Sequence, residues 1–196
     1  MIRKVLAIFL SGIVVAHSSQ SSLSPCPTET SVVWTKCFGA LTWSDGSEYV
    51  GAIYNDKPNG QGTVIFPDGA KYVGNHKDGV RSGRGTFIYP DGAKYVGNFL
   101  NDKPNGQGIK TYPNGRKYIG EFKNGSRNDQ GTLIYPEGAR YVGTFKNDTF
   151  NGKGTFYFPD GKKYVGEFLN GEPSVPGTMT YPNGKKETYG QDKPSP

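Results

Sequence analysis

The stretch "IYPDGAKYVGNFLNDKPNGQG", residues 88–108, decides the fold because most of its letters recur along the chain at a fixed distance. It contains a Pro-Asp-Gly turn at residues 90–92, a run of strand-forming residues at 94–99 and a second glycine-containing segment. The same order of residues returns every 23 positions. A fixed period of this length is typical of repeat proteins, in which each unit stacks on its neighbours.

The most regular part of the repeat is a tyrosine followed two residues later by a glycine. A proline-containing turn ending in glycine and a further glycine in the second strand recur with the same period. Aromatic residues make up 13% of the chain, which favours an ordered structure despite the many glycines and prolines. The signature residues are Tyr49, Gly51, Tyr72, Gly74, Tyr95, Gly97, Tyr118, Gly120, Tyr141, Gly143, Tyr164 and Gly166.

Each repeat contains two segments of strand character, such as "GTFIY" (85–89) and "KYVGNF" (94–99). The Pro-Asp-Gly between them suits a short hairpin loop, and we expect residues 100–107 to form a longer loop that leads to the next strand. Alternation along a strand places Tyr95, Gly97 and Phe99 on one face. The fixed glycines then give the aromatic rings room to lie over neighbours that have no side chain.

The segments "YVGEFLNG" (164–171) and "YVGTFKNDTFNGKGTFYFPDG" (141–161) resemble MORN repeats, and the resemblance extends over about residues 41–186. It implies an all-β fold: an elongated, single-layer antiparallel β-meander of about six 23-residue β-hairpin repeats. It also implies a role in binding, scaffolding or membrane apposition. Catalysis in MORN-containing enzymes lies in separate domains, and no room remains for one here. We therefore expect no enzymatic activity and no cofactor.

The first 18 residues, "MIRKVLAIFLSGIVVAHS", have the pattern of a secretory signal sequence. Two basic residues precede an apolar run of about 12 residues, which is shorter than the roughly 20 needed for a membrane-spanning helix. We expect an exported protein, periplasmic or secreted, with membrane association left open. An uncleaved anchor is the alternative.

The two cysteines, Cys26 and Cys37, follow this leader closely. In an exported protein such a pair is most simply a disulfide. A redox-active pair is a weak alternative, because the chain has no Cys-x-x-Cys. We expect residues 19–40 to cap the first repeat and residues 187–196 to form a tail.

Few residues could support catalysis or metal binding. Outside the leader the only histidine is His76, at a position where other repeats have phenylalanine, so we expect it to pack in the sheet. Acidic residues recur in the turns, but about two strands apart, which is too far for two of them to share one Ca²⁺. Aspartate is also simply a favoured turn residue. These turn carboxylates are Asp45, Asp68, Asp91, Glu137 and Asp160.

After the first signature tyrosine, a basic residue occupies one fixed position in every repeat, directly before the tyrosine or its counterpart. We call this set the basic row: Lys71, Lys94, Lys117, Arg140, Lys163 and Lys186. Such a stripe could attract an anionic partner, or it could only solvate the sheet and prevent aggregation. The sequence therefore predicts a scaffold for a protein or envelope component, with binding to anionic lipid head groups as the alternative. Nucleic acid is not an expected partner, and the oligomeric state stays open.

Overall fold

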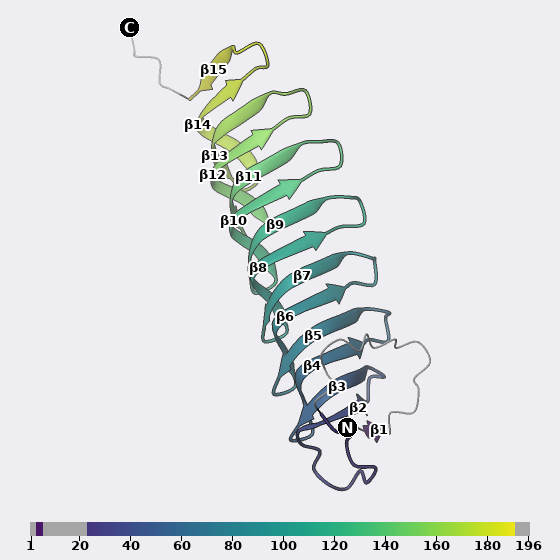
Figure 1. Cartoon of the computed structure of the whole chain (residues 1–196). Coiled ribbons are helices and arrows are strands. Elements are labelled where there is room, and N and C mark those ends of the chain that lie inside the picture. The colour runs from purple at the N-terminus through teal and green to yellow at the C-terminus, as the bar shows by residue number, and fades with distance from the viewer. Residues whose placement is uncertain (1–2, 6–22, 191–196) are drawn as a thin grey trace. The chain divides into compact units, whose positions relative to one another are not determined.

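The computed structural model describes residues 3–5 and 23–190, and all regular structure in this part of the chain is β-strand. Consecutive strands pair in antiparallel fashion, as Figure 1 shows. This confirms the expected all-β, antiparallel meander of about six hairpin repeats. No stretch of the described residues forms an apolar helix of membrane-spanning length.

The chain divides into two compact units, residues 1–103 and 104–196. The first contains β1 (Arg3–Val5), β2 (Cys37–Thr42), β3 (Glu48–Tyr54), β4 (Lys57–Ile65), β5 (Lys71–Lys77), β6 (Val80–Ile88) and β7 (Lys94–Leu100). The second contains β8 (Lys103–Thr111), β9 (Lys117–Lys123), β10 (Ser126–Ile134), β11 (Arg140–Lys146), β12 (Thr149–Tyr157), β13 (Lys163–Leu169), β14 (Glu172–Thr180) and β15 (Lys186–Tyr189).

The prediction of a long loop at residues 100–107 is wrong. Only Asn101 and Asp102 form the turn, and β8 begins at Lys103. Both turn residues have positive φ, at 48° and 66°, which is the conformation that a two-residue hairpin turn requires. The glycine-rich segment after the turn is strand, with Gly106 at a φ of 79°. The equivalent pairing of β3 with β4 shifts register between Gly51 and Ile53, so a bulge absorbs the glycine that suggested a loop.

The core of each unit is a row of buried tyrosine rings on one face of the sheet, which we call the inner face. In the first five repeats the hydroxyl donates a hydrogen bond to a backbone carbonyl three residues on, for example from Tyr72 to Asn75 at 2.8 Å and from Tyr118 to Glu121 at 2.9 Å. The Tyr164 hydroxyl donates instead to the Ser174 carbonyl at 2.6 Å. The rings lie over paired glycines, as the sequence predicted: a Cβ on Gly74 would lie 2.6 Å from the Tyr72 Oη. Of the signature tyrosines, five are fully buried: Tyr49, Tyr72, Tyr95, Tyr118 and Tyr141.

Phenylalanine rings join the tyrosines edge to face. In unit 2, Phe145 contacts Tyr118 and Tyr141 at centroid distances of 4.9 and 5.2 Å. His76 takes the equivalent place in unit 1 and contacts Tyr49 and Tyr72, both at 5.1 Å. Edge-to-face pairs at such distances are favourable beyond their buried area. This ladder ties each hairpin to the one before it.

The N-terminal part of unit 1 is joined to the sheet by the expected Cys26–Cys37 disulfide. Trp34 is 1% exposed, and its backbone N–H donates to the Asp56 carboxylate at 2.7 Å. Of the expected signal sequence only Arg3–Val5 lie within the described residues, where they pair with β2, and Lys4 forms an ion pair with Asp56 at 2.7 Å. The rest of the leader, and residues 191–196 of the expected tail, lie outside the described residues.

Candidate interaction surfaces

The basic row lies on the outer face of the sheet, opposite the tyrosines. Lys71 and Lys94 lie in unit 1, and the other four members lie in unit 2, each at the first residue of its strand. Between them the register places Ile, Thr or Tyr: Lys117 faces Thr111 and Ile134. Within each unit, basic side chains therefore recur every second strand, about 9–10 Å apart. Arg140 packs over the ring of Tyr157 at 4.2 Å, which reduces its freedom to reach a ligand.

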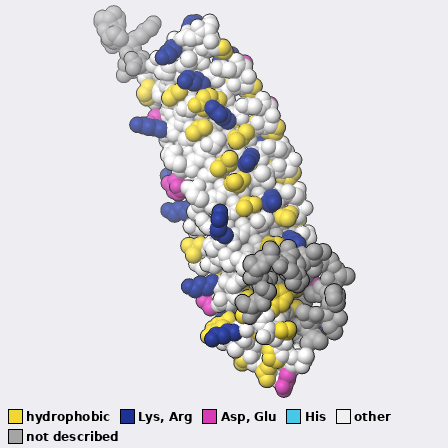
Figure 2. Space-filling view, viewed as in Figure 1, with side chains coloured by type: hydrophobic (Ala, Val, Ile, Leu, Met, Phe, Trp, Pro, Cys, Tyr) yellow, Lys and Arg dark blue, Asp and Glu magenta, His cyan; other side chains and the backbone are white. Residues whose placement is uncertain are grey.

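Next to the basic row the outer face exposes a second row, made of β-branched residues. Sequence reasoning missed it, although a valine or isoleucine follows every signature tyrosine; Val50 is buried, and Ile109 joins the row from β8 as the partner of Ile119. Its large members are between 38% and 45% exposed, and threonines such as Thr132 and Thr155 lie opposite them on the intervening strands. We call it the aliphatic row: Val73 and Val96 in unit 1, and Ile109, Ile119, Val142 and Val165 in unit 2. Hydrophobic side chains also lie close to Lys and Arg side chains on the face shown in Figure 2.

Most of the turn carboxylates have a local structural role. Asp45, Asp68 and Asp91 each accept a hydrogen bond from the backbone N–H two residues on, at 2.9 Å. Asp160 does the same at 3.1 Å and pairs with Lys162 at 2.9 Å. These contacts hold the pKa of Asp45 and Asp160 below the ordinary value. The main cause is the hydrogen bond from the Ser47 backbone N–H for Asp45 and the hydrogen bond from the Lys162 side chain for Asp160. Within the described ranges, no three His, Cys, Asp or Glu residues come together as a metal site.

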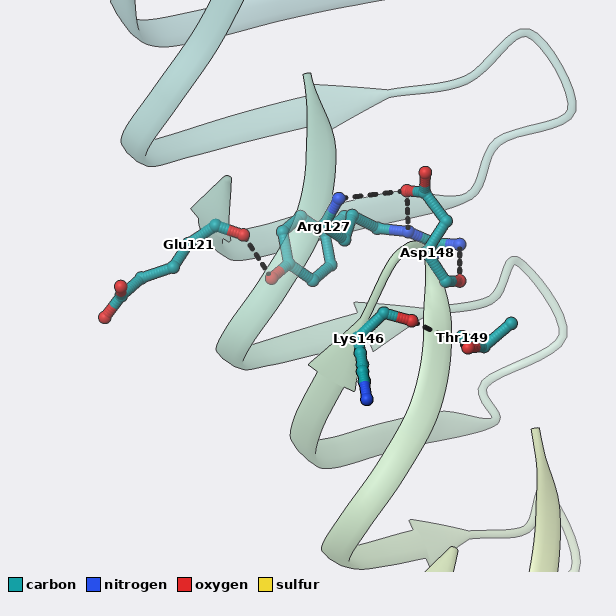
Figure 3. Close-up of polar contacts among 6 residues, drawn as sticks. Glu121, Arg127, Lys146, Asp148 and Thr149 are labelled. Atoms are coloured by element: carbon teal, nitrogen blue, oxygen red, sulfur yellow. Dashed lines mark hydrogen bonds and ion pairs between the residues drawn. The ribbon is translucent and has the colours of Figure 1, made fainter. Parts of the chain in front are cut away.

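An arginine–aspartate contact links successive hairpins in both units. In unit 2 the Arg127 Nε donates to the Asp148 carboxylate at 3.0 Å, its backbone N–H donates to the same oxygen, and Nη2 donates to the Asp148 carbonyl (Figure 3). In unit 1, Arg81 and Asp102 repeat the contact at 3.0 Å. Both aspartates are the second residue of a two-residue turn with positive φ. Sequence reasoning missed this contact, whose only signal is a 46-residue spacing between the two arginines.

The guanidinium groups also cover aromatic rings. The Arg81 Cζ lies 4.9 Å from the Phe87 centroid and 5.7 Å from that of Tyr72. In unit 2, Arg127 lies 5.7 Å from the ring of Tyr118. A cation held over ring faces and paired with a carboxylate is immobilised. The two arginines therefore cover aromatic rings on the inner face of the sheet.

A further row of aromatic residues borders the inner face, which sequence reasoning also missed. These residues directly follow β2, β4, β6, β8, β10, β12 and β14 and, after the first, directly precede the turn proline. All are partly exposed. We call this set the ring row: Trp43, Phe66 and Tyr89 in unit 1, and Tyr112, Tyr135, Phe158 and Tyr181 in unit 2.

Each unit has a groove between members of the ring row. In unit 1 a groove of about 360 Å³ is lined by Trp43 and Phe66, with Val64 and His76 also in its wall and the Arg81–Asp102 pair beside them. In unit 2 a groove of about 270 Å³ is lined by Tyr112 and Tyr135 with Leu133. Grooves of this kind, mainly apolar with a few polar groups, are common binding sites.

His76 packs as expected but lacks hydrogen-bond partners. It is 5% exposed, and neither ring nitrogen makes a hydrogen bond of good geometry with a described residue. Burial lowers the pKa of the imidazole to about 4; the nearby backbone of Gly74 and Gly60 opposes the shift only in part. The side chain is therefore neutral at pH 7. Its ring contacts with Tyr49 and Tyr72 make it part of the packed core.

The architecture and surfaces define a β-hairpin repeat protein. The MORN repeat family matches residues 49–71, 72–94, 95–115, 118–140, 141–163 and 164–186. The chain belongs to the MORN-repeat family, and the resemblance seen in the sequence is confirmed. A comparison with curated protein sequences gave no match.

Among solved structures the chain is similar to the SAS-4 (dCPAP) TCP domain of Drosophila melanogaster, solved with a proline-rich motif of Ana2. The identity is 16%, the TM-score 0.49, and the match covers 86% of this chain and 97% of that one. It is also similar to the TCP10 domain of Danio rerio CPAP, solved with a peptide of STIL, at 19% identity, a TM-score of 0.33 and 77% coverage of each chain. At these scores neither similarity bears on what this chain binds.

Proposed function

We propose that this chain is an exported, non-enzymatic repeat scaffold that binds a protein or envelope component through the outer face of its sheet. MORN repeats suggest a scaffold or binding protein. The observation that carries the proposal is the aliphatic row beside the basic row. Exposed apolar side chains aligned over several strands of one face are typical of interaction sites. Lysines beside them add charge complementarity and select against neutral or cationic partners.

The proposal is tested by charge reversal on the outer face. A triple variant, Lys117→Glu, Lys163→Glu and Lys186→Glu, reverses the charge of three members of the basic row in unit 2 and leaves the tyrosine core intact. We expect the wild-type chain from residue 19 onward, with its disulfide formed, to retain a specific protein from an envelope extract, and the triple variant to retain much less. A matched control, Lys123→Glu, removes an exposed lysine at the end of β9 and should leave retention unchanged. Equal retention by all three proteins would contradict the proposal.

The second candidate is peripheral binding to anionic lipid head groups, favoured by the alignment of the basic row. No ion pair within the described residues neutralises Lys117, Lys163 or Lys186. A basic side chain near an anionic surface contributes about 1 kcal/mol, and the effect falls with salt. Co-sedimentation with anionic and neutral vesicles at low and moderate salt separates the candidates. Strong, salt-sensitive binding to anionic vesicles alone would favour the lipid candidate. No binding to either kind of vesicle would favour the protein partner.

A further inference from the structure

In unit 1 the groove between Trp43 and Phe66 is left open by small side chains. Val64 lies in its wall, at the place in the repeat that Phe87 has one period later, and Ser47 lies at the adjoining turn. On the other side of Phe66 the corresponding space is filled, because the Phe87 ring lies 5.8 Å from the Phe66 ring. The open groove has a volume of about 360 Å³, which is large enough for a ligand group.

In unit 2 the turn position that Ser47 has in unit 1 carries basic side chains, and these cover aromatic rings. Arg116 has its Cζ 4.9 Å from the centroid of Tyr135. Lys162 repeats the arrangement, with its Nζ 5.8 Å from the centroid of Tyr181. The chain itself therefore shows one kind of group that fits this space, which is a cation lying against a member of the ring row.

A carboxylate two residues before this position can pair with the cation. In unit 2 the Lys162 Nζ lies 2.9 Å from the Asp160 Oδ2. Asp45 has the corresponding place in unit 1, where it is exposed and forms no ion pair with a described residue. The Ser47 backbone N–H donates to one Asp45 oxygen at 2.9 Å and holds the carboxylate beside the groove. Unit 1 thus has the anion of this pair without its cation.

The charges in the groove wall of unit 1 also favour a cation. Two carboxylates line it, those of Asp45 and Asp102, together with the guanidinium group of Arg81. Arg81 donates twice to the Asp102 Oδ1, and the other Asp102 oxygen has no hydrogen-bond partner within the described part of the chain. His76, also in the wall, is neutral at pH 7 because burial lowers its pKa to about 4. One further positive charge would balance the wall.

A second guanidinium group beside Arg81 is compatible with this type of groove. In unit 2, Arg116 and Arg127 both line the groove, and among the described residues of that wall Asp148 alone carries a carboxylate. Unit 2 therefore accommodates two guanidinium groups with one carboxylate. The groove of unit 1 offers two carboxylates to Arg81 and an incoming cation, which is the more favourable balance.

We propose that the groove between Trp43 and Phe66 binds an arginine side chain from a basic segment of a protein partner. The flat guanidinium group lies against the two rings and donates hydrogen bonds to Asp45 and Asp102. Arginine suits the groove better than lysine, because its guanidinium group is flat and less strongly hydrated than an ammonium group. An aromatic side chain, such as the Phe87 ring in the next space, would add no charge to pair with the carboxylates.

Three short capped peptides serve as probes. They consist of glycine and serine and differ only in the central residue, which is arginine, phenylalanine or citrulline, the neutral analogue of arginine. Binding to the full chain is followed by the NMR signals of the two indole N–H groups, with that of Trp34, which is 1% exposed, as the internal reference. We expect the arginine peptide to shift the Trp43 signal with a roughly millimolar Kd, about tenfold tighter than the others, and to bind more weakly in high salt.

Two variants locate the site. Asp45→Asn keeps the turn, since Asn114 has this place in unit 2 and accepts the Arg116 N–H at 3.2 Å, and it should weaken binding of the arginine peptide roughly fivefold. Ser47→Arg supplies the cation from the chain itself and should abolish binding while the thermal unfolding curve stays close to that of the wild type. The matched control is Asp68→Asn, which removes the charge from the next turn and should leave the affinity unchanged.

Equal affinity for the arginine and citrulline peptides, or tighter binding of the phenylalanine peptide, would overturn the inference. So would an arginine peptide that leaves the Trp43 signal in place, or a Ser47→Arg variant that binds it as the wild type does. Equal losses in Asp45→Asn and Asp68→Asn would also overturn it, because they would assign the effect to overall charge.

This inference rests on the proposed binding of a protein partner but adds a contact on the inner face, where Val64 pairs with Tyr72. The two proposals can fail separately. If the arginine peptide did not bind while the triple Lys→Glu variant lost a protein that the wild type retained, the outer-face function would stand without this site.

Discussion

The phenol ring of Tyr72 lies directly over Gly85, although the two residues are not register partners. Gly85 pairs with Gly74, and a Cβ at Gly85 would lie 2.5 Å from both Cε2 and Oη of Tyr72. The same relationship joins Tyr118 to Gly131 and Tyr141 to Gly154. The glycines of the repeat are therefore fixed by the volume of a ring that crosses the strand pair.

Gly85→Ala should destabilise unit 1 by about 3 kcal/mol, because the new methyl group must displace a buried ring. Gly92→Ala is the matched control. It has open space around it but a φ of +86°, and should cost only about 1 kcal/mol. Urea unfolding followed by circular dichroism measures both. Similar losses for the two variants would show that backbone conformation, not ring volume, fixes the glycines.

High pH should destabilise the protein through its tyrosines. Burial raises the pKa of Tyr72 and Tyr141 to about 12, above the ordinary value of 10. The folded state thus holds these protons more tightly than the unfolded state, so their stabilising contribution is complete below pH 10 and is lost between pH 10 and 12. Tyr72→Phe should weaken this dependence and cost about 1 kcal/mol at neutral pH through the lost hydrogen bond. An unchanged pH profile in the variant would contradict this assignment.

Mild acid should destabilise unit 1 through His76. Its pKa is about 4 when folded and 6.5 when unfolded, so the unfolded state takes up the proton first as the pH falls. Stability should decline from about pH 6.5 to pH 4, by on the order of 3 kcal/mol in total. His76→Phe restores the residue type of the other repeats and should remove this decline while keeping or raising stability at pH 7. If His76→Phe retained the full loss of stability between pH 6.5 and pH 4, a group other than His76 would be its cause.

The contact between Arg127 and Asp148 should contribute modestly, because about half of the Asp148 side chain is exposed. Asp148→Asn keeps a residue that tolerates positive φ and removes the charge, so we expect a loss of about 0.5–1 kcal/mol that shrinks at high salt. A double-mutant cycle with Arg127→Gln isolates the pairwise term. Asp160→Asn is the control for an exposed pair and should have an effect near zero. A coupling energy of zero between Arg127 and Asp148 would contradict this prediction, because the contact would then contribute nothing to stability.

Much of the fold could be predicted from the sequence, because a fixed period and strict alternation determine which residues share a face. The placement of Tyr95, Gly97 and Phe99 and the β-meander follow from such local rules. The Cys26–Cys37 disulfide was predicted separately, from the presence of two cysteines close to the leader. The loop expected at residues 100–107 was wrong because a bulge can absorb Gly106 within a strand. The Arg81–Asp102 contact could not be predicted, since it depends on how one hairpin is placed against the next.

The candidate surfaces were predicted less completely than the fold. The basic row was found because charge is conspicuous in a sequence. The aliphatic row was missed because an exposed valine in a strand looks like a core residue until the register is known. The ring row was missed because an aromatic residue before a proline turn looks like packing; its partial exposure becomes visible only in three dimensions.

The central claim is that the outer face contacts a protein, and site-specific photo-crosslinking in cells tests it most directly. The crosslinking side chain is placed at Val142, a member of the aliphatic row that is 40% exposed, and as a control at Glu137 in the neighbouring turn. The account predicts a discrete adduct of higher mass from Val142 and none of that mass from Glu137. No discrete protein adduct from Val142, or the same adducts from both positions, would contradict it.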